Sequence, residues 1–80
     1  MPDAAAIEME RKKVRRLQWM MSMVMSTISQ NDRMPVEEAS ELIASARKAA
    51  LRMFPGKEST YDLLYRPRFQ RLMQEKYNLQ

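Results

Sequence analysis

The sequence predicts an all-α fold: a small three-helix domain with a long first helix and a third helix kinked or split at Pro67. Three observations lead to this prediction. The chain is rich in good helix formers such as alanine, leucine, methionine and arginine, and poor in β-branched residues. Its hydrophobic residues recur at spacings of three and four. Two proline-containing stretches, SQNDRMP and FPGKES, divide its 80 residues into three segments, which form one domain at most.

The first predicted helix covers residues 4–29. Asp3 suits its N-cap, because a carboxylate can accept hydrogen bonds from the free N–H groups of the first turn. No glycine or proline interrupts the segment. At about 100° per residue, most of its large apolar side chains fall on one face. They form a predicted core seam: Ile7, Val14, Leu17, Met20, Met21, Val24 and Ile28.

The second predicted helix covers residues 35–54. Pro35 suits its first turn, and Glu37 and Glu38 suit its positively polarised N-terminal end. The FPGKES stretch ends it. Alanines in its apolar stripe predict a close approach of the neighbouring helix. That stripe consists of Val36, Ala39, Ile43, Ala46, Ala50 and Met53, flanked by Leu42 and Phe54.

The third predicted helix covers residues 60–77. Ser59 and Asp62 form a variant of the capping box at its start. Pro67 then either kinks this helix, or one helix ends near Arg66 and another starts at Pro67. The apolar residues expected to pack are Tyr61, Leu64, Tyr65, Phe69, Leu72, Met73 and Tyr77.

The apolar run LQWMMSMVMSTI, residues 17–28, follows the basic run RKKVRR and could be taken for a membrane segment. A spanning helix needs about 20 apolar residues, and Gln18, Ser22 and Ser26 interrupt this shorter run. The residues after it also lack a signal-peptide cleavage pattern. We therefore expect no membrane partner. The absence of cysteine is compatible with a reducing compartment, so we expect a cytoplasmic protein.

The composition argues against enzyme chemistry. There is no cysteine and no histidine, which removes thiolate nucleophiles, imidazole bases and ordinary zinc ligands. The acids mostly occupy first turns or polar helix faces. FPGK lacks the spacing of a phosphate-binding loop. We expect no enzyme, no cofactor, no metal site and no small-molecule substrate.

Two side chains of the first helix are not explained by the core seam. Trp19 and Met23 point away from it, on the same face as Lys12 and Arg16, in steps of four, three and four residues. Such a second strip is normally covered. Its cover would come from the third segment of the same chain, from a second copy in a homodimer, or from another protein. Trp19, Met23, Lys12 and Arg16 are therefore the candidate partner-binding residues.

Basic residues offer a second candidate function. The net charge is +4, and the cations are concentrated in the first and third segments. Lys and Arg side chains there could contact phosphates. However, the first cluster wraps around its helix, and no recognition motif accompanies it. We expect a non-catalytic interaction module that forms a homodimer, with a small nucleic-acid-binding protein as the alternative. Further candidate anion contacts are Lys13, Arg15, Arg66, Arg68 and Arg71.

Overall fold

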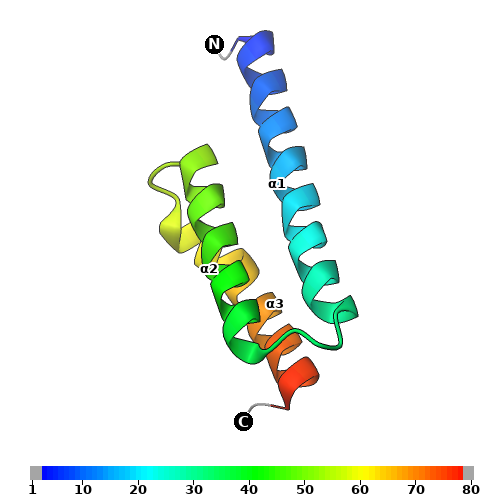
Figure 1. Cartoon of the computed structure of the whole chain (residues 1–80). Coiled ribbons are helices and arrows are strands. Elements are labelled where there is room, and N and C mark those ends of the chain that lie inside the picture. The colour runs from blue at the N-terminus through cyan, green and yellow to red at the C-terminus, as the bar shows by residue number, and fades with distance from the viewer. Residues whose placement is uncertain (1–2, 79–80) are drawn as a thin grey trace.

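The computed structural model describes residues 3–78, which form three α-helices and no strand. They are α1 (Ala4–Gln30), α2 (Val36–Met53) and α3 (Glu58–Tyr77). Helices α1 and α2 run in opposite directions side by side, and α3 returns toward the α1–α2 loop (Figure 1). The predicted all-α, three-helix fold is confirmed.

A side-chain hydrogen bond is made at each end of α1. The backbone N–H of Ala5 donates to the Asp3 carboxylate over 3.2 Å, which confirms Asp3 as the N-cap. At the other end the backbone carbonyl of Asn31 accepts from the Lys76 ammonium over 2.8 Å. Since Lys76 belongs to the last turn of α3, this bond fixes the C-terminal end of α3 beside the α1–α2 loop.

The N-terminal part of α1 extends beyond the other two helices (Figure 1). Helix α2 ends at Met53, and Phe54 lies level with Lys13, whose ammonium is 5.3 Å from the ring centre. The earlier turns of α1 therefore have no neighbouring helix. As a result Ile7 is 45% exposed, and Val14, at the edge of the packed region, is 42% exposed. The predicted core seam is thus wrong at these two residues, although it holds from Leu17 to Ile28.

Helix α2 packs through its small residues. Ala39, Ala46 and Ala50 are its buried side chains, which confirms the predicted close approach. The helix starts one residue later than expected, because Pro35 has extended backbone angles and acts as the N-cap.

Helix α3 is continuous through Pro67, so the alternative of two separate helices is not observed. The predicted capping box is also wrong. The helix begins at Glu58 after Lys57, without a side-chain cap, so Ser59 already lies within the first turn. The carboxylate of Asp62 bonds to Arg47 of α2 instead.

The core consists of two adjoining clusters in which all three helices take part. The buried residues of the first are Met21, Ala46, Ala50, Tyr61, Tyr65 and Phe69, and those of the second are Ile28, Met34, Ala39 and Met73. Two tyrosine hydroxyls near these clusters have acceptors. Tyr61 donates to the Met21 sulfur over 3.5 Å, and Tyr77 donates to the backbone carbonyl of Met34 over 2.8 Å. The core is thin, as expected for a chain of this size.

Candidate interaction surfaces

The side of α1 that faces away from the bundle carries its most unusual residues. Trp19 is 64% exposed and Met23 is 49% exposed. Trp19 precedes the buried Met21 by two residues, which places it about 200° around the helix. Helix α3 packs on the opposite side, where Tyr61 reaches Met21. The expectation that the third segment covers Trp19 is therefore wrong, because the apolar face of α3 is already occupied by the core.

Residues spaced alternately by four and three positions form a continuous strip on this side of α1. We call it the outer strip, and all of its members are exposed: Ala5, Met9, Lys12, Arg16, Trp19, Met23, Ser26 and Gln30. Lys12, Arg16 and Trp19 also line one shallow, open depression of about 490 Å³ together with Arg15. The structure thus brings together the predicted stack of cations and tryptophan. The strip is basic before Trp19 and uncharged after it.

Lys13 does not belong to this strip. Its ammonium lies 3.7 Å from the Glu10 carboxylate and faces the ring of Phe54. Arg11 likewise lies 3.8 Å from Glu8 on the same helix. Such exposed pairs stabilise a helix only slightly. The basic run is therefore divided, with Lys12, Arg15 and Arg16 on the outer side.

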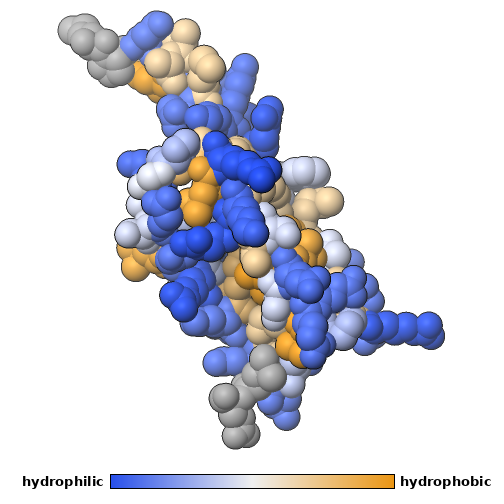
Figure 2. All heavy atoms as spheres, turned by 60° about the vertical axis from the view of Figure 1, so that its left-hand side comes forward, coloured by the Kyte–Doolittle hydropathy of each residue, from blue (hydrophilic) through white to orange (hydrophobic). Residues whose placement is uncertain are grey.

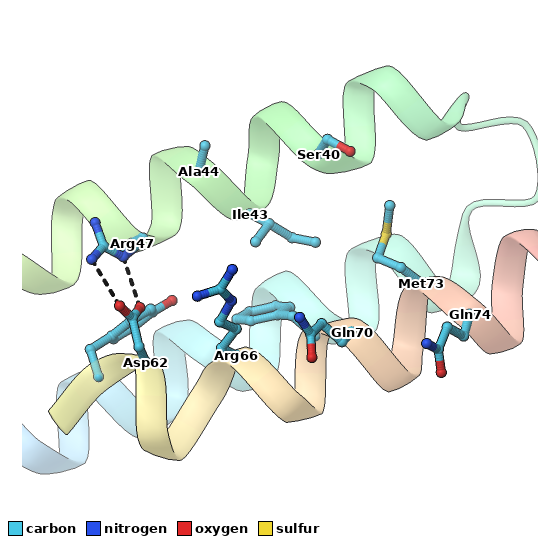
Figure 3. Close-up of a pocket in the computed structure, with 11 residues that line it drawn as sticks. Ser40, Ile43, Ala44, Arg47, Asp62, Arg66, Gln70, Met73 and Gln74 are labelled. Carbon is cyan, nitrogen blue, oxygen red and sulfur yellow. Dashed lines mark hydrogen bonds and ion pairs between the residues drawn. The ribbon is translucent and has the colours of Figure 1, made fainter. Parts of the chain in front are cut away.

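The arginines of α3 do not form one surface. Arg66 points into the space between α2 and α3 (Figure 3). Arg68 follows two residues later and so lies about 200° around the helix. Its guanidinium is 5.5 Å from the centre of the Tyr65 ring. Arg71 is one turn after Arg68, on that same side, and is exposed.

An open groove of about 760 Å³ lies between α2 and α3 (Figure 3). Ile43, Phe69 and Met73 contribute its apolar part. At one end Arg47 donates two hydrogen bonds to the carboxylate of Asp62, from Nε over 2.9 Å and from Nη2 over 3.1 Å. No local sequence pattern indicates this pair, because the two residues lie on different helices. Hydrophobic surface is visible between hydrophilic side chains on the face shown in Figure 2.

The Arg47–Asp62 pair makes a prediction about acid stability. The hydrogen bond from Arg47 lowers the pKa of Asp62, against an opposing effect of desolvation, and the charges of Arg47 and Arg66 lower it further. A carboxyl group whose pKa is lower in the folded state stabilises the fold at neutral pH. We expect that contribution to disappear as the pH falls below about 4. The melting temperature of Asp62→Asn should therefore fall less between neutral and acidic pH than that of wild type. Thermal unfolding at both pH values measures this difference.

Glu41→Gln is the matched control for this experiment, because Glu41 is an exposed acid of α2 that makes no ion pair with Arg47 or its neighbours within residues 3–78. It should leave the acid dependence of the melting temperature close to that of wild type. Equal acid dependence in wild type and Asp62→Asn would contradict a stabilising role for the pair.

A smaller groove of about 370 Å³ lies near the open end of the bundle, where α1 passes the ends of α2 and α3. Val14, Leu51 and Leu64 are among its apolar residues. Leu64 was expected to pack but is 57% exposed, since no part of α1 or α2 covers it. The groove is therefore the uncovered end of the core.

No protein-family model, curated protein or solved structure matches the chain. Within residues 3–78, no helix is long and apolar enough to cross a membrane. The same residues contain no group of three or more acids that could hold a metal ion.

Proposed function

We propose that this protein is a non-catalytic helical interaction module that forms a homodimer through the outer strip of α1. The observation that carries the proposal is the exposure of Trp19 and Met23 as neighbours on one helix face. Lys12 and Arg16 continue the same face and form its polar border. Its proposed location is the cytoplasm.

Burial of these two side chains would supply the driving force. A tryptophan side chain can remove about 150–250 Å² from water, and Trp is enriched among residues that dominate binding energy. The flexible thioether of Met23 can fill gaps against a partner surface. A short chain with a thin core also gains more from association than a larger domain does.

Substitution of the two apolar residues tests the proposal. We expect Trp19→Ala or Met23→Glu to raise the dimer Kd at least about 30-fold, as expected for residues at the centre of an interface. Sedimentation equilibrium over a range of protein concentrations measures this change. Leu63→Glu is the matched control, since Leu63 is 78% exposed on α3 and away from the outer strip.

The fluorescence of Trp19 provides an independent measurement, because it is the only tryptophan. Its emission should shift to shorter wavelength as protein concentration rises and the indole leaves water. A wild-type monomer at the highest concentrations, with unchanged emission, would contradict the homodimer.

A nucleic-acid-binding function is the second candidate, and one observation favours it. Trp19 borders the depression that Lys12, Arg15 and Arg16 line, and an indole can stack on an exposed base. Against this candidate, the α3 arginines lie on other sides of the molecule. If the protein does bind single-stranded oligonucleotides, the affinity should fall steeply as the salt concentration rises. Association through Trp19 and Met23 should persist at high salt, so salt titration separates the two functions.

A further inference from the structure

We infer that the two copies pack with their α1 helices antiparallel, so that Trp19 of each lies against the partner's Met23. The two-fold axis then crosses the outer strip between these residues, at the level of Met21. This inference rests on the proposed homodimer and adds its orientation and register. It follows from the spacing of the outer strip, from its charges and from the charge distribution along the molecule.

The spacing of the outer strip is that of a helix-pairing seam. Its residues alternate in steps of four and three, which is the repeat of the a and d positions in a coiled coil. Met9, Arg16 and Met23 occupy one of these position types, and Lys12 and Trp19 occupy the other. A second α1 helix therefore fits the strip along several turns.

The charges on the strip decide the orientation. A parallel pair would place Lys12 beside the partner's Lys12 and Arg16 beside the partner's Arg16, and like charges at such distances repel. In the antiparallel pair Arg16 lies opposite the partner's Ser26, and Lys12 lies opposite the partner's Gln30. Both partners in these contacts are uncharged. Each cation also approaches the C-terminal end of an α-helix, where the helix dipole is negative and α1 has no basic residue of its own.

The charge distribution along the whole molecule favours the same antiparallel orientation. The end at which α1 projects has more bases than acids: Arg11, Lys12, Lys13, Arg15, Arg16, Lys48, Arg52 and Lys57, against Asp3, Glu8, Glu10 and Glu58. The end that carries the α1–α2 loop has more acids than bases: Asp32, Glu37, Glu38 and Glu75, against Arg33 and Lys76. Antiparallel packing places the basic end of each copy beside the acidic end of the other. The partner best matched to this face is therefore a second copy of the chain.

The apolar residues decide the register. Sliding the partner by two turns would place Arg16 against the partner's Trp19 and Lys12 against the partner's Met23. Both apolar side chains would then face cations. The register proposed here instead joins Trp19 and Met23 of both copies in one apolar centre, with the cations toward its ends, where they reach solvent. The contact uses one helix from each copy, so its area is at the low end for specific dimers and the affinity should be modest.

Disulfide trapping tests both orientation and register, because the native chain contains no cysteine. Arg16→Cys and Ser26→Cys are made as separate variants, one of them carrying a mass tag, and are oxidised alone and mixed. We expect a covalent dimer of one Arg16→Cys chain and one Ser26→Cys chain in the mixture, and no covalent dimer from either alone. Leu63→Cys, exposed on α3, measures cross-linking by random collision. Lys12→Cys with Gln30→Cys is a second pair that tests the same register.

The outcomes separate the inference from the function on which it rests. Covalent dimers from Arg16→Cys alone would overturn the inference while leaving a homodimer, and covalent dimers from Ser26→Cys alone as well would show a parallel pair. Sedimentation as a dimer, with no mixed product above the Leu63→Cys level from either pair, would overturn the register. Sedimentation of wild type as a monomer would overturn the proposed function itself.

Discussion

Phe69→Ala is expected to lower the free energy of unfolding by about 3–5 kcal/mol. The Phe69 ring is 3% exposed and belongs to the cluster that joins α1, α2 and α3. Its removal would leave a cavity that neighbouring backbones are too constrained to fill. A domain of this size has a total stability of about 5 kcal/mol. The variant should therefore be largely unfolded at physiological temperature.

Urea unfolding followed by circular dichroism measures this loss. Protein concentration must be the same for all variants, because the proposed dimer would add to the apparent stability. Leu63→Ala is the matched control, since its side chain is 78% exposed on the same helix. It should change the stability by no more than about 0.5 kcal/mol. A loss of less than about 1 kcal/mol for Phe69→Ala would contradict the packing of α3 against the other helices.

The helices could be predicted because local signals and core packing agree along most of the chain. Asp3, the alanine stripe of α2 and the periodic aromatic residues of α3 each indicate the same structure. The errors have a common physical origin. Ile7 and Val14 carry the correct spacing for a core seam, but spacing does not reveal how far the neighbouring helices reach. Ser59 has the correct chemistry for a cap, but the chain enters α3 earlier.

The candidate surface could be predicted only in part for a related reason. Helical geometry alone places Trp19 and Met23 on the side opposite Met21, and this placement is confirmed. Whether α3 covers that side depends on which face of α1 the tyrosines of α3 pack against. The Arg47–Asp62 pair depends on the same arrangement, since it joins α2 to α3. To predict contacts between helices, one must know the relative positions of whole helices. A single sequence specifies these positions only weakly.

Pro67→Ala is expected to raise the free energy of unfolding by about 2 kcal/mol. Proline costs about 3 kcal/mol relative to alanine inside a helix, because it lacks an N–H and its ring crowds the preceding turn. In α3 the backbone carbonyl of Leu63 loses its usual donor at Pro67. Alanine restores this hydrogen bond. Part of the gain is offset, since replacing proline increases the entropy of the unfolded chain by an amount worth up to about 1 kcal/mol.

The position of Pro67 explains why the fold tolerates it. Pro67 is exposed, on the side of α3 away from the buried Tyr65 and Phe69, so the carbonyl of Leu63 can bond to water. Glu75→Ala, an exposed change in the same helix, controls for the helix propensity of alanine and should alter stability by less than about 0.5 kcal/mol. Urea unfolding of both variants measures the difference. A loss of stability in Pro67→Ala would instead mean that the backbone geometry set by proline is what allows Tyr65 and Phe69 to pack against α1 and α2 together.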